Sequence, residues 1–353
     1  MKRAELSAGR LGELVACFSR SRLAVVGDFF LDKYLDVDPS IEEVSVETGK
    51  PAHQVVARRS SPGAAGTVVC NLHALGAGKL HAVGFSGDDG EGFDLRDGLQ
   101  RLGCTISHLH ATPERMTPTY LKPRNQGDAT LAAEHSRYDT KNRTPTPVAI
   151  SQRVVASIEE LLPELDALLV MDQAEEEDCG VVTRLVREAL TEFAARHPKV
   201  FFWADSRRRI AEYRGVMIKP NQFEAVGQAD PLPGDEVSLD VLQEAMGKLR
   251  RTTGAPIVAT RGAHGALVTD PEWTLVSGVR VEGETDPTGA GDSASAGIAL
   301  ALCAGASIPE AVVVGNLVAS ITIQQIGTTG VARPDQLATR RLMWEEQLNA
   351  SEY

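Results

Sequence analysis

The segment DPTGAGDSASAG, residues 286–297, places two aspartates and three glycines immediately before an apolar run that is predicted to be helical. The first backbone N–H groups of a helix have no intrahelical acceptor, and the helix dipole makes that end partly positive. Glycines let an anion approach the bare backbone. We therefore expect Gly289, Ala290 and Gly291 to cradle a phosphate group or a developing oxyanion.

Asp292 follows this cradle and has two interpretations. Taken alone, its position favours a helix-capping role. Beside an anion site it predicts a general base, because phosphoryl transfer needs a carboxylate that takes the proton of the acceptor hydroxyl while N–H donors stabilise the phosphoryl charge. Asp286 is expected to brace the loop through backbone N–H groups, as aspartates do in turns.

Competing nucleotide-site and hydrolase signatures are absent from the sequence. It contains no GxxxxGK[ST] P-loop, no GxGxxG after the first predicted strand, no GxSxG elbow and no HExxH. These absences argue against P-loop NTPases, standard dinucleotide-binding folds, α/β-hydrolases and zincins.

Composition indicates a globular protein with a large hydrophobic core. Of the 353 residues, 42% are hydrophobic, and the formal net charge of −12 argues against nucleic-acid or anionic-membrane partners. The five cysteines are widely spaced and odd in number, which favours a reducing cytosol over disulfides or a zinc site. The N-terminal segment lacks the apolar core of a signal peptide, and no apolar run reaches the ~20 residues of a membrane span. We therefore expect a cytoplasmic protein.

The elements that must position this chemistry alternate along the chain. Strands are predicted at 23–28, 80–85, 166–172, 200–205, 215–221 and 256–262, and helices at 63–75, 92–103 and 291–305. Apolar strands joined by helices predict an α/β fold with a mostly parallel central sheet covered on both faces. Ligands of such folds bind beyond the carboxyl ends of the strands. Five strands end there in polar or flexible residues (GD, MD, AD, KPN and TRG), which favours a site over ordinary turns.

Two segments, about 33–60 and 117–138, interrupt this alternation. Both predict short, partly polar strands that would form a small sheet outside the main one and act as a lid over the strand ends. The alternative is a pair of surface excursions. We assign residues 1–340 to one domain that includes the lid, and residues 341–353 to a C-terminal tail.

DPTGAGD resembles the D-T-x-G-A-G-D signature of the ribokinase-like (PfkB) carbohydrate kinases. The resemblance extends over roughly residues 20–335 and includes, in family order, VVGDFFLDKY, PGAAGTVVCNLHALGA, KPNQFE, TRGAHG and GNLVASITIQQIGTTG. Within the family, GDFFLDKY, PRNQ and EYRGVMIKPNQFEAVG are most similar to the kinase half of heptose 7-phosphate kinase/adenylyltransferases. No HxGH nucleotidyltransferase motif is present. The resemblance implies a three-layer α/β/α sandwich with a small β lid, and a carbohydrate kinase that uses ATP and Mg²⁺.

The resemblance also implies roles for individual residues. Asp292 matches the catalytic base, and Gly289, Ala290 and Gly291 match the anion hole. Asn221 and Glu224 match residues that would organise Mg²⁺ and the ATP phosphates, often through water. The other matched cofactor positions are Thr260, Arg261, Gly262 and Gly265 of the nucleotide loop, and Asp286, Asn316 and Thr328. The expected substrate-binding residues are Asp28, Asp32, Gly63, Ala64, Thr67 and Arg124.

The sugar-binding segments depart from the family pattern. Ala64 and Thr67 stand where the family has a second glycine and an asparagine, which adds a methyl group and replaces an amide by one hydroxyl. MDQAEEED and ADSRRR replace lysine-bearing motifs of the heptose kinases. The acidic run 175–178 would repel a phosphorylated sugar if it faced the site. The arginine run 207–209 would bind one through bidentate contacts, unless it is a solvated helical turn.

These observations favour an ATP-dependent kinase of a small sugar or sugar phosphate. A sugar phosphate that resembles heptose 7-phosphate is one candidate substrate. A nucleoside or other polyol kinase of the same fold stays open because of residues 64 and 67, as does a non-catalytic ligand-binding relative. Family members often dimerise through the lid, so the resemblance implies a homodimer, with no nucleic-acid or membrane partner.

Overall fold

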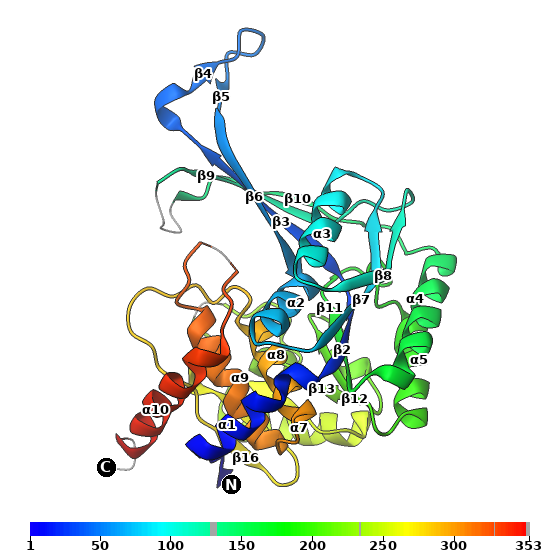
Figure 1. Ribbon diagram of the computed structural model, residues 1–353, viewed down its shortest axis with the longest axis vertical. Helices are drawn as coiled ribbons and strands as arrows, with labels where there is room; N and C mark the ends of the chain where they lie inside the picture. The colour runs from blue at the N-terminus through cyan, green and yellow to red at the C-terminus, as the bar shows by residue number, and fades with distance from the viewer. Residues whose placement is uncertain (128–132, 233, 328, 351–353) are drawn as a thin grey trace.

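The structure is a computed structural model that describes residues 1–127, 133–232, 234–327 and 329–350. Its centre is a six-stranded sheet in the order β13-β12-β11-β2-β7-β8, with all pairings parallel (Figure 1). The strands are β2 (Arg22–Gly27), β7 (Lys79–Gly87), β8 (Thr105–Thr112), β11 (Ala167–Asp172), β12 (Phe201–Ser206) and β13 (Met217–Ile218). The parallel sheet expected from the apolar runs is confirmed.

A second sheet continues the first beyond β13. It has the order β1-β16-β15-β14 and contains β1 (Lys2–Arg3), β14 (Val258–Thr260), β15 (Ala266–Val268) and β16 (Thr274–Val276). Parallel bridges from Ile218 to Ile257 and from Asn221 to Thr260 join β14 to the end of β13. The segments that carry KPN and TRG therefore end side by side.

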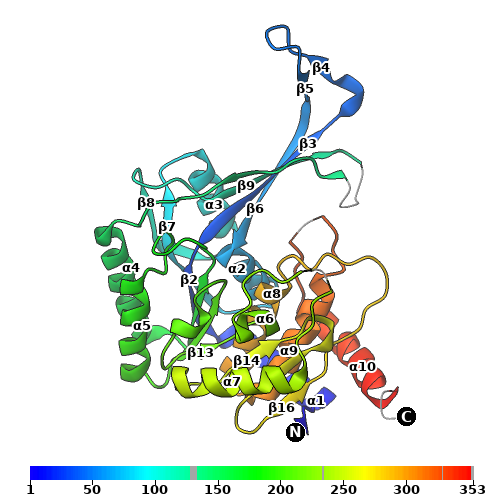
Figure 2. The same cartoon turned by 180° about the vertical axis from the view of Figure 1, so that it is seen from behind.

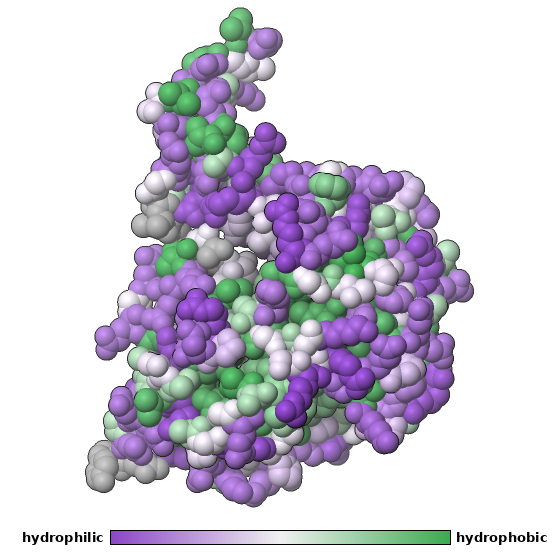
Figure 3. All heavy atoms as spheres, in the orientation of Figure 1, coloured by the Kyte–Doolittle hydropathy of each residue, from purple (hydrophilic) through white to green (hydrophobic). Residues whose placement is uncertain are grey.

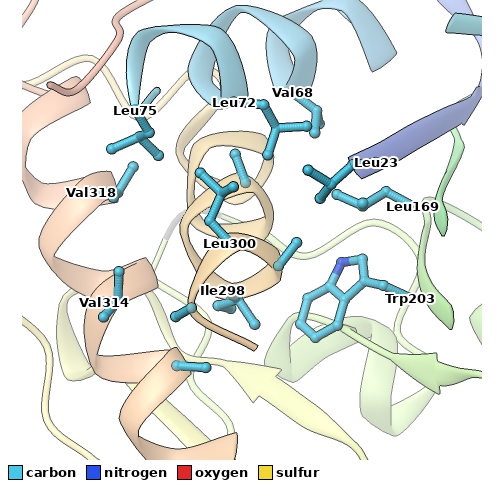
Figure 4. Close-up of a cluster of buried hydrophobic side chains, with 14 of the residues drawn as sticks. Leu23, Val68, Leu72, Leu75, Leu169, Trp203, Ile298, Leu300, Val314 and Val318 are labelled. Carbon is cyan, nitrogen blue, oxygen red and sulfur yellow. The ribbon is translucent and has the colours of Figure 1, made fainter. Parts of the chain in front are cut away.

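Helices cover both faces of the central sheet. One face packs against α1 (Ala8–Cys17), α2 (Ala65–Ala74), α8 (Ala290–Cys303), α9 (Ile308–Thr322) and α10 (Pro334–Ala350), and the other against α4 (Val148–Leu161), α5 (Arg184–Arg196) and α7 (Leu239–Thr253). Successive strand residues serve opposite faces, because Leu23 joins the first cluster and Ala24 the second. Figure 4 shows the first cluster, where Leu169 and Trp203 from the sheet face α8. None of the described helices is long and apolar enough to cross a membrane.

The lid is a separate four-stranded sheet that projects from the body as an arm (Figures 1 and 2). Its order is β10-β9-β3-β6, with β3 (Phe29–Val37), β6 (Val55–Ala64), β9 (Thr119–Asn125) and β10 (Tyr138–Thr140), and the hairpin of β4 (Glu43–Val44) and β5 (Pro51–Ala52) forms its tip. These strands overlap the predicted lid segments, about 33–60 and 117–138. The prediction of short strands is wrong for β3 and β6, which have nine and ten residues. Strand β3 is long because it already starts in the core, where one residue separates it from the end of β2.

The C-terminal segment is part of the body, and the tail predicted after residue 340 is wrong. Helix α10 continues to Ala350, since no glycine or proline interrupts RRLMWEEQLNA. Arg341 and Trp344 are buried, and they donate hydrogen bonds to the carbonyl oxygens of Leu6 (2.9 Å) and Ser277 (3.1 Å). The helix thereby fastens the N-terminal segment to the loop after β16.

Candidate active site

A cleft of about 230 Å³ lies between the lid and the carboxyl end of the central sheet. It is lined by the lid, by the loops that follow β11 and β12, by the starts of α2 and α8, and by Thr329. The lining residues are Phe30, Asp32, Ala64, Thr67, Tyr120, Lys122, Arg137, Lys141, Gln173, Glu175, Arg207, Thr288, Gly289, Asp292 and Thr329. Five of the residues predicted from the sequence are among them: Asp32, Ala64, Thr67, Gly289 and Asp292.

The turn before α8 leaves the start of the helix without a side-chain cap among the described residues, and the Ala290 N–H donates to the Pro287 carbonyl at 3.1 Å. The role of residues 289–291 as an anion cradle stays a prediction. Gly289 precedes the helix with φ 75°, and a Cβ there would lie 3.1 Å from Thr329 Cγ2 and 3.3 Å from Thr67 Cγ2. The expected bracing by Asp286 is present: its carboxylate accepts a hydrogen bond from the Thr288 N–H at 3.0 Å. No side chain caps this helix in the described chain, so the capping interpretation of Asp292 is wrong.

Asp292 is partly exposed on the cleft. Burial is the largest of the causes that raise the pKa of this carboxyl to about 7; the Asp205 and Asp32 carboxylates also raise it, while Lys219 and Arg207 oppose the shift. A base whose pKa lies near the working pH is well suited to accept a hydroxyl proton. The environment of Asp292 therefore fits a general base.

A buried charge cluster lies behind Asp292. Lys219 and Asp205 form an ion pair with 2.6 Å between Nζ and Oδ2, and both residues are less than a tenth exposed. Burial raises the pKa of Glu224 to about 7, with a further contribution from Asp205. AD and KPN end two predicted strands, but no role was predicted for Asp205 or Lys219, although a lysine at the end of an apolar strand was the available signal.

Asn221 and Glu224 form the capping box of the short helix α6 (Gln222–Val226). Asn221 Oδ1 accepts from the N–H groups of Phe223 and Glu224 at 2.8 and 2.9 Å, and Glu224 Oε2 accepts from the Asn221 N–H at 2.7 Å. Within the described ranges, no group of three or more His, Cys, Asp or Glu residues could hold a metal ion. These two residues would thus have to bind Mg²⁺ together with water or phosphate oxygens, a coordination that Mg²⁺ readily accepts.

The predicted nucleotide loop lies next to this capping box. The loop turns tightly, because the Arg261 N–H donates to the Gly265 carbonyl at 2.7 Å. A Cβ at Gly265, where φ is 83°, would lie only 2.0 Å from the Val276 carbonyl oxygen, and Gly262 also has a positive φ of 55°. Arg261 Nε is buried without a hydrogen-bond partner in the described part of the chain, which fits an anionic group bound there.

Two other residues, Asn316 and Thr328, are predicted to bind the cofactor. Asn316 donates from Nδ2 to the Ser277 carbonyl at 3.1 Å and so holds the loop after β16. Thr328 lies outside the described residues. The roles of these two residues in nucleotide binding stay predictions.

One side of the cleft is built around Asp32. Its carboxylate lies 2.9 Å from Lys122 Nζ, and a Cβ at Gly63 would lie 2.5 Å from Asp32 Oδ2. Glycine is therefore required at position 63 to leave room for this carboxylate. Thr67 is buried at the start of α2.

Asp28 and Arg124 do not line this cleft in the described structure. The Asp28 carboxylate accepts three backbone hydrogen bonds, from the N–H groups of Gln173, Ala174 and Val181 at 2.7–2.8 Å. It faces an adjoining pocket and holds the loop after β11. Arg124 points toward the carbonyl of Gly327, with 3.3 Å between Nη1 and the oxygen.

Ala64 has a backbone conformation that suits glycine. Its φ of 52° and ψ of −114° lie outside the regions that residues with a Cβ adopt without strain. We expect Ala64→Gly to raise the free energy of unfolding by about 1 kcal/mol, measured by urea denaturation. The matched control is Ala57→Gly in the same strand, which should lower it by about 0.5–1 kcal/mol. Destabilisation by both substitutions would contradict the strain at residue 64.

The three consecutive arginines have three different surroundings. Arg207 lines the cleft, with 3.6 Å between its Nε and Glu175 Oε1. Arg208 reaches Asp230 at the surface at 3.1 Å and also lies 3.7 Å from Glu175 Oε2. Arg209 is buried against Asp172 at 2.7 Å. The prediction that this run binds a sugar phosphate as a unit is wrong, because the turn after β12 directs only the first side chain into the cleft.

The sequence analysis did not identify the cations that the lid contributes. Lys122, Arg137 and Lys141 line the cleft and lie over the ring of Tyr120, with centroid distances of 5.9, 4.4 and 6.0 Å. Lys122 pairs with Asp32 and Arg137 with Asp139. Lys141 has no ion pair among the described residues. The available signal was the density of basic residues in and just after the segment 117–138.

Comparison with known proteins places this geometry in context. Residues 21–335 match the family described as pfkB family carbohydrate kinase. Bifunctional protein HldE of Stutzerimonas stutzeri (strain A1501) is 30% identical over 325 residues, which cover 90% of this chain and 63% of that protein. The chain thus spans less than two thirds of the length of this curated relative.

Solved structures show the same fold. Phosphofructokinase-2 from Escherichia coli in complex with substrates and products gives a TM-score of 0.67 at 18% identity and covers 91% of this chain and 99% of its own. Arabidopsis thaliana ribokinase complexed with ribose and ATP gives 0.65 at 16% identity, with coverages of 91% and 98%. The three-layer sandwich with a β lid is therefore confirmed.

Proposed function

Because the chain belongs to the pfkB family of carbohydrate kinases, we propose that it transfers the γ-phosphoryl group of ATP to a hydroxyl of a small sugar or sugar phosphate. The observation that carries this proposal is Asp292, a carboxyl with a pKa of about 7 that opens on the cleft directly after the amides of residues 289–291.

The reaction follows from this placement. Asp292 takes the proton of the acceptor hydroxyl, whose oxygen forms a bond to the γ-phosphorus while the bond from that phosphorus to the β–γ bridging oxygen breaks, so that ADP leaves. The amides at the start of α8 stabilise the charge on the phosphoryl oxygens. Asn221 and Glu224 would hold Mg²⁺ through water, and the bound ion supplies charge neutralisation for the phosphates.

Charges in the cleft favour an acceptor that carries a phosphate. Four cationic side chains line it, against the three carboxylates of Asp32, Glu175 and Asp292. Lys141 and Arg207 approach from the lid and from the body, so a phosphate between them would draw the two parts together. A structure of phosphofructokinase-2 from Escherichia coli, which has the same fold, is in complex with fructose-6-phosphate, and this supports a phosphorylated sugar as acceptor.

One observation favours a neutral polyol instead. Glu175 lies 3.6 Å from Arg207 and lines the same cleft, so it offsets part of the positive charge. A nucleoside fits less well, because the adjoining pocket beside Phe30 and Phe85 has only about 30 Å³, room for about two waters.

A panel of acceptors tests the proposed function. Sugars, sugar phosphates, polyols and nucleosides are each supplied with ATP and Mg²⁺, and ADP production is measured. We expect turnover, with kcat/KM highest for a sugar phosphate. Turnover on unphosphorylated polyols alone would select the second candidate, and the absence of ADP release above the ATPase background with every acceptor would overturn the proposal.

Lys141 is the lid cation that this proposal assigns to the acceptor phosphate. Lys141→Gln should raise KM for a phosphorylated acceptor about tenfold, because the free energy of one hydrogen bond to a charged group corresponds to a change of that size. KM for ATP should stay unchanged. Lys50→Gln, on the exposed tip of the arm, is the matched control and should change neither constant. An equal rise in both KM values would show that Lys141 acts on the whole site.

The lid also suggests how the chain assembles. β6 is an edge strand of the lid sheet, and five apolar residues of the arm are more than two fifths exposed: Ile41, Val44, Val46, Val55 and Val56. Figure 3 shows apolar residues gathered on this arm. An open edge with exposed apolar side chains favours pairing with another chain. We propose a homodimer through the lid, which light scattering tests, since a monomer at micromolar concentration would contradict it.

The five cysteines are consistent with reaction in the cytoplasm. All of them are free thiols in the structure, and a reducing compartment keeps thiols in this state. We propose that the kinase acts there on a soluble sugar substrate, without nucleic-acid or membrane partners.

A further inference from the structure

We propose that the pocket beside the cleft binds a methyl substituent of the acceptor, so that the substrate is a deoxy sugar or its phosphate. The inference rests on the proposed function, because it concerns the acceptor of that reaction. It gives an occupant to the pocket of about 30 Å³ that adjoins the cleft.

The pocket and the cleft share one border. Five residues line both of them: Phe30, Tyr120, Lys141, Gln173 and Glu175. The rings of Phe30 and Tyr120 are in contact, with 5.1 Å between their centroids. A ligand in the cleft can therefore extend one substituent past this aromatic pair and into the pocket.

The interior of the pocket, which the cleft does not share, has apolar walls. Phe85, Pro118 and Val181 line it, and Phe85 and Val181 are only 3% and 2% exposed. The volume admits about two waters, which is room for a methyl or a hydroxymethyl group but not for a sugar ring. Size alone thus limits the occupant to one small substituent.

The polar side chains that line this interior already have partners within the chain. The Asp28 carboxylate accepts three backbone hydrogen bonds at 2.7–2.8 Å, which occupy three of its about four acceptor positions. The Asn142 amide donates to the Met116 carbonyl at 2.8 Å and accepts from the Met116 N–H at 3.1 Å. Glu176 pairs with Arg143 at 2.6 Å.

These bonds decide between the two substituents that fit. A hydroxyl in the interior would compete for groups that are already bonded, and a buried hydroxyl that gains no partner is costly. A methyl group needs no partner and is stabilised by the apolar walls. Asp28 then holds the loop that closes the pocket instead of binding a sugar hydroxyl, and Lys141 and Gln173 remain at the border for the polar groups of the same ligand.

Acceptors that differ in one substituent test the inference. The 1-phosphates of xylose, 6-deoxyglucose and glucose carry hydrogen, methyl and hydroxymethyl at the same carbon, and the corresponding manno and galacto series are supplied in the same way. This carbon and the one that carries the phosphate flank the ring oxygen, so both substituents can reach the border that the pocket shares with the cleft.

With ATP and Mg²⁺, kcat/KM in the best series should be at least about tenfold higher for the methyl acceptor than for the other two. Hydrogen at this carbon leaves the pocket unfilled, and hydroxymethyl places a hydroxyl among groups that are already bonded. An acceptor with hydrogen or hydroxymethyl that equals the methyl acceptor would overturn the inference.

A substitution inside the pocket gives a second test. Val181→Leu adds a methylene to the interior and should lower kcat/KM of the methyl acceptor about tenfold, while the hydrogen acceptor is unaffected. Val182→Leu is the matched control, because Val182 is also 2% exposed but does not line the pocket. Equal losses for the two acceptors in Val181→Leu would contradict the assignment. If this variant does not fold, the wild-type series decides.

Binding without turnover separates this inference from the proposed function. The proton NMR signal of the methyl group is followed when the 6-deoxy sugar phosphates are mixed with the protein in the absence of ATP. A methyl group among the rings of Phe30, Phe85 and Tyr120 should shift upfield, and Val181→Leu should abolish the shift. If the wild type shows no kinase activity, this shift still supports the pocket. Its absence for every methyl-bearing probe would overturn the inference, whether or not the kinase is active.

Discussion

Asp292→Asn is expected to lower kcat about 1,000-fold and to leave ATP binding within about twofold, because general base catalysis contributes roughly 10²–10⁴ in rate. Asparagine keeps the size of the side chain but cannot take the acceptor proton. The measurements are ADP release with the best acceptor of the panel and calorimetric titration with ATP. Turnover close to that of the wild type would remove Asp292 from the mechanism.

The same substitution should also stabilise the fold at high pH. The pKa of Asp292 is about 7 in the folded protein against an ordinary 3.8. Since the folded value is raised, the stabilising contribution is complete below about pH 4 and is lost as the pH rises through 7. The Asn variant should therefore match the wild type at pH 4 and exceed it by about 4 kcal/mol at pH 8, since each pKa unit corresponds to about 1.4 kcal/mol. Glu224 and Asp28 titrate in both proteins, so their contributions cancel in this comparison.

Thermal melts at the two pH values distinguish this explanation from a local packing effect. A packing effect would change the melting temperature by similar amounts at pH 4 and pH 8. A gain in stability combined with a loss of turnover would show that the fold carries the cost of a buried base because catalysis requires it.

The sequence predicted the fold well where one physical rule dominates. Strands such as β2 and β11 are apolar on both faces, and only a parallel sheet between two helical layers buries both. The position of the lid could be predicted from the sequence, but the lengths of its strands could not. The apolar start of β3, from Phe29 to Leu31, is buried by the core although it belongs to the lid.

The turn at Gly289 and the capping box of Asn221 and Glu224 depend on backbone geometry near one residue. The turn was expected from the sequence and the capping box was not, and the roles of these residues in binding stay predictions. The Lys219–Asp205 pair was not predictable, because it depends on β12 and β13 being neighbours and on which side chain turns inward. The same limit applies to Ala64, whose strain becomes visible only with its φ angle.

The arginine run shows this limit most clearly, since three identical neighbours have three environments. Arg209 is buried and donates to both oxygens of Asp172 at 2.7 and 3.3 Å, and Asp172 is fully buried. Ser206 and Tyr213 donate to the same carboxylate at 2.6 and 3.3 Å. Arg209 also donates to the carbonyls of residues 174 and 175, in the loop that lines the cleft.

We therefore expect Arg209→Met to lower the free energy of unfolding by about 3–4 kcal/mol, because it leaves a buried carboxylate without its cation. Arg208→Met is the matched control: its ion pair with Asp230 is largely exposed, and its loss should change stability by less than about 0.5 kcal/mol. Urea denaturation measures both. In the double variant Arg209→Met/Asp172→Asn, stability should partly recover, since no charge remains buried.

The same pair of variants tests whether the loop 173–181 depends on Arg209. This loop is fixed by the Asp28 carboxylate on one side and by Arg209 on the other. In Arg209→Met, the loop should become sensitive to limited proteolysis and the acceptor KM should rise, with ATP binding preserved. If Arg208→Met reproduced these effects, the run would act through its total charge, and the separate roles that the structure gives to the two arginines would be wrong.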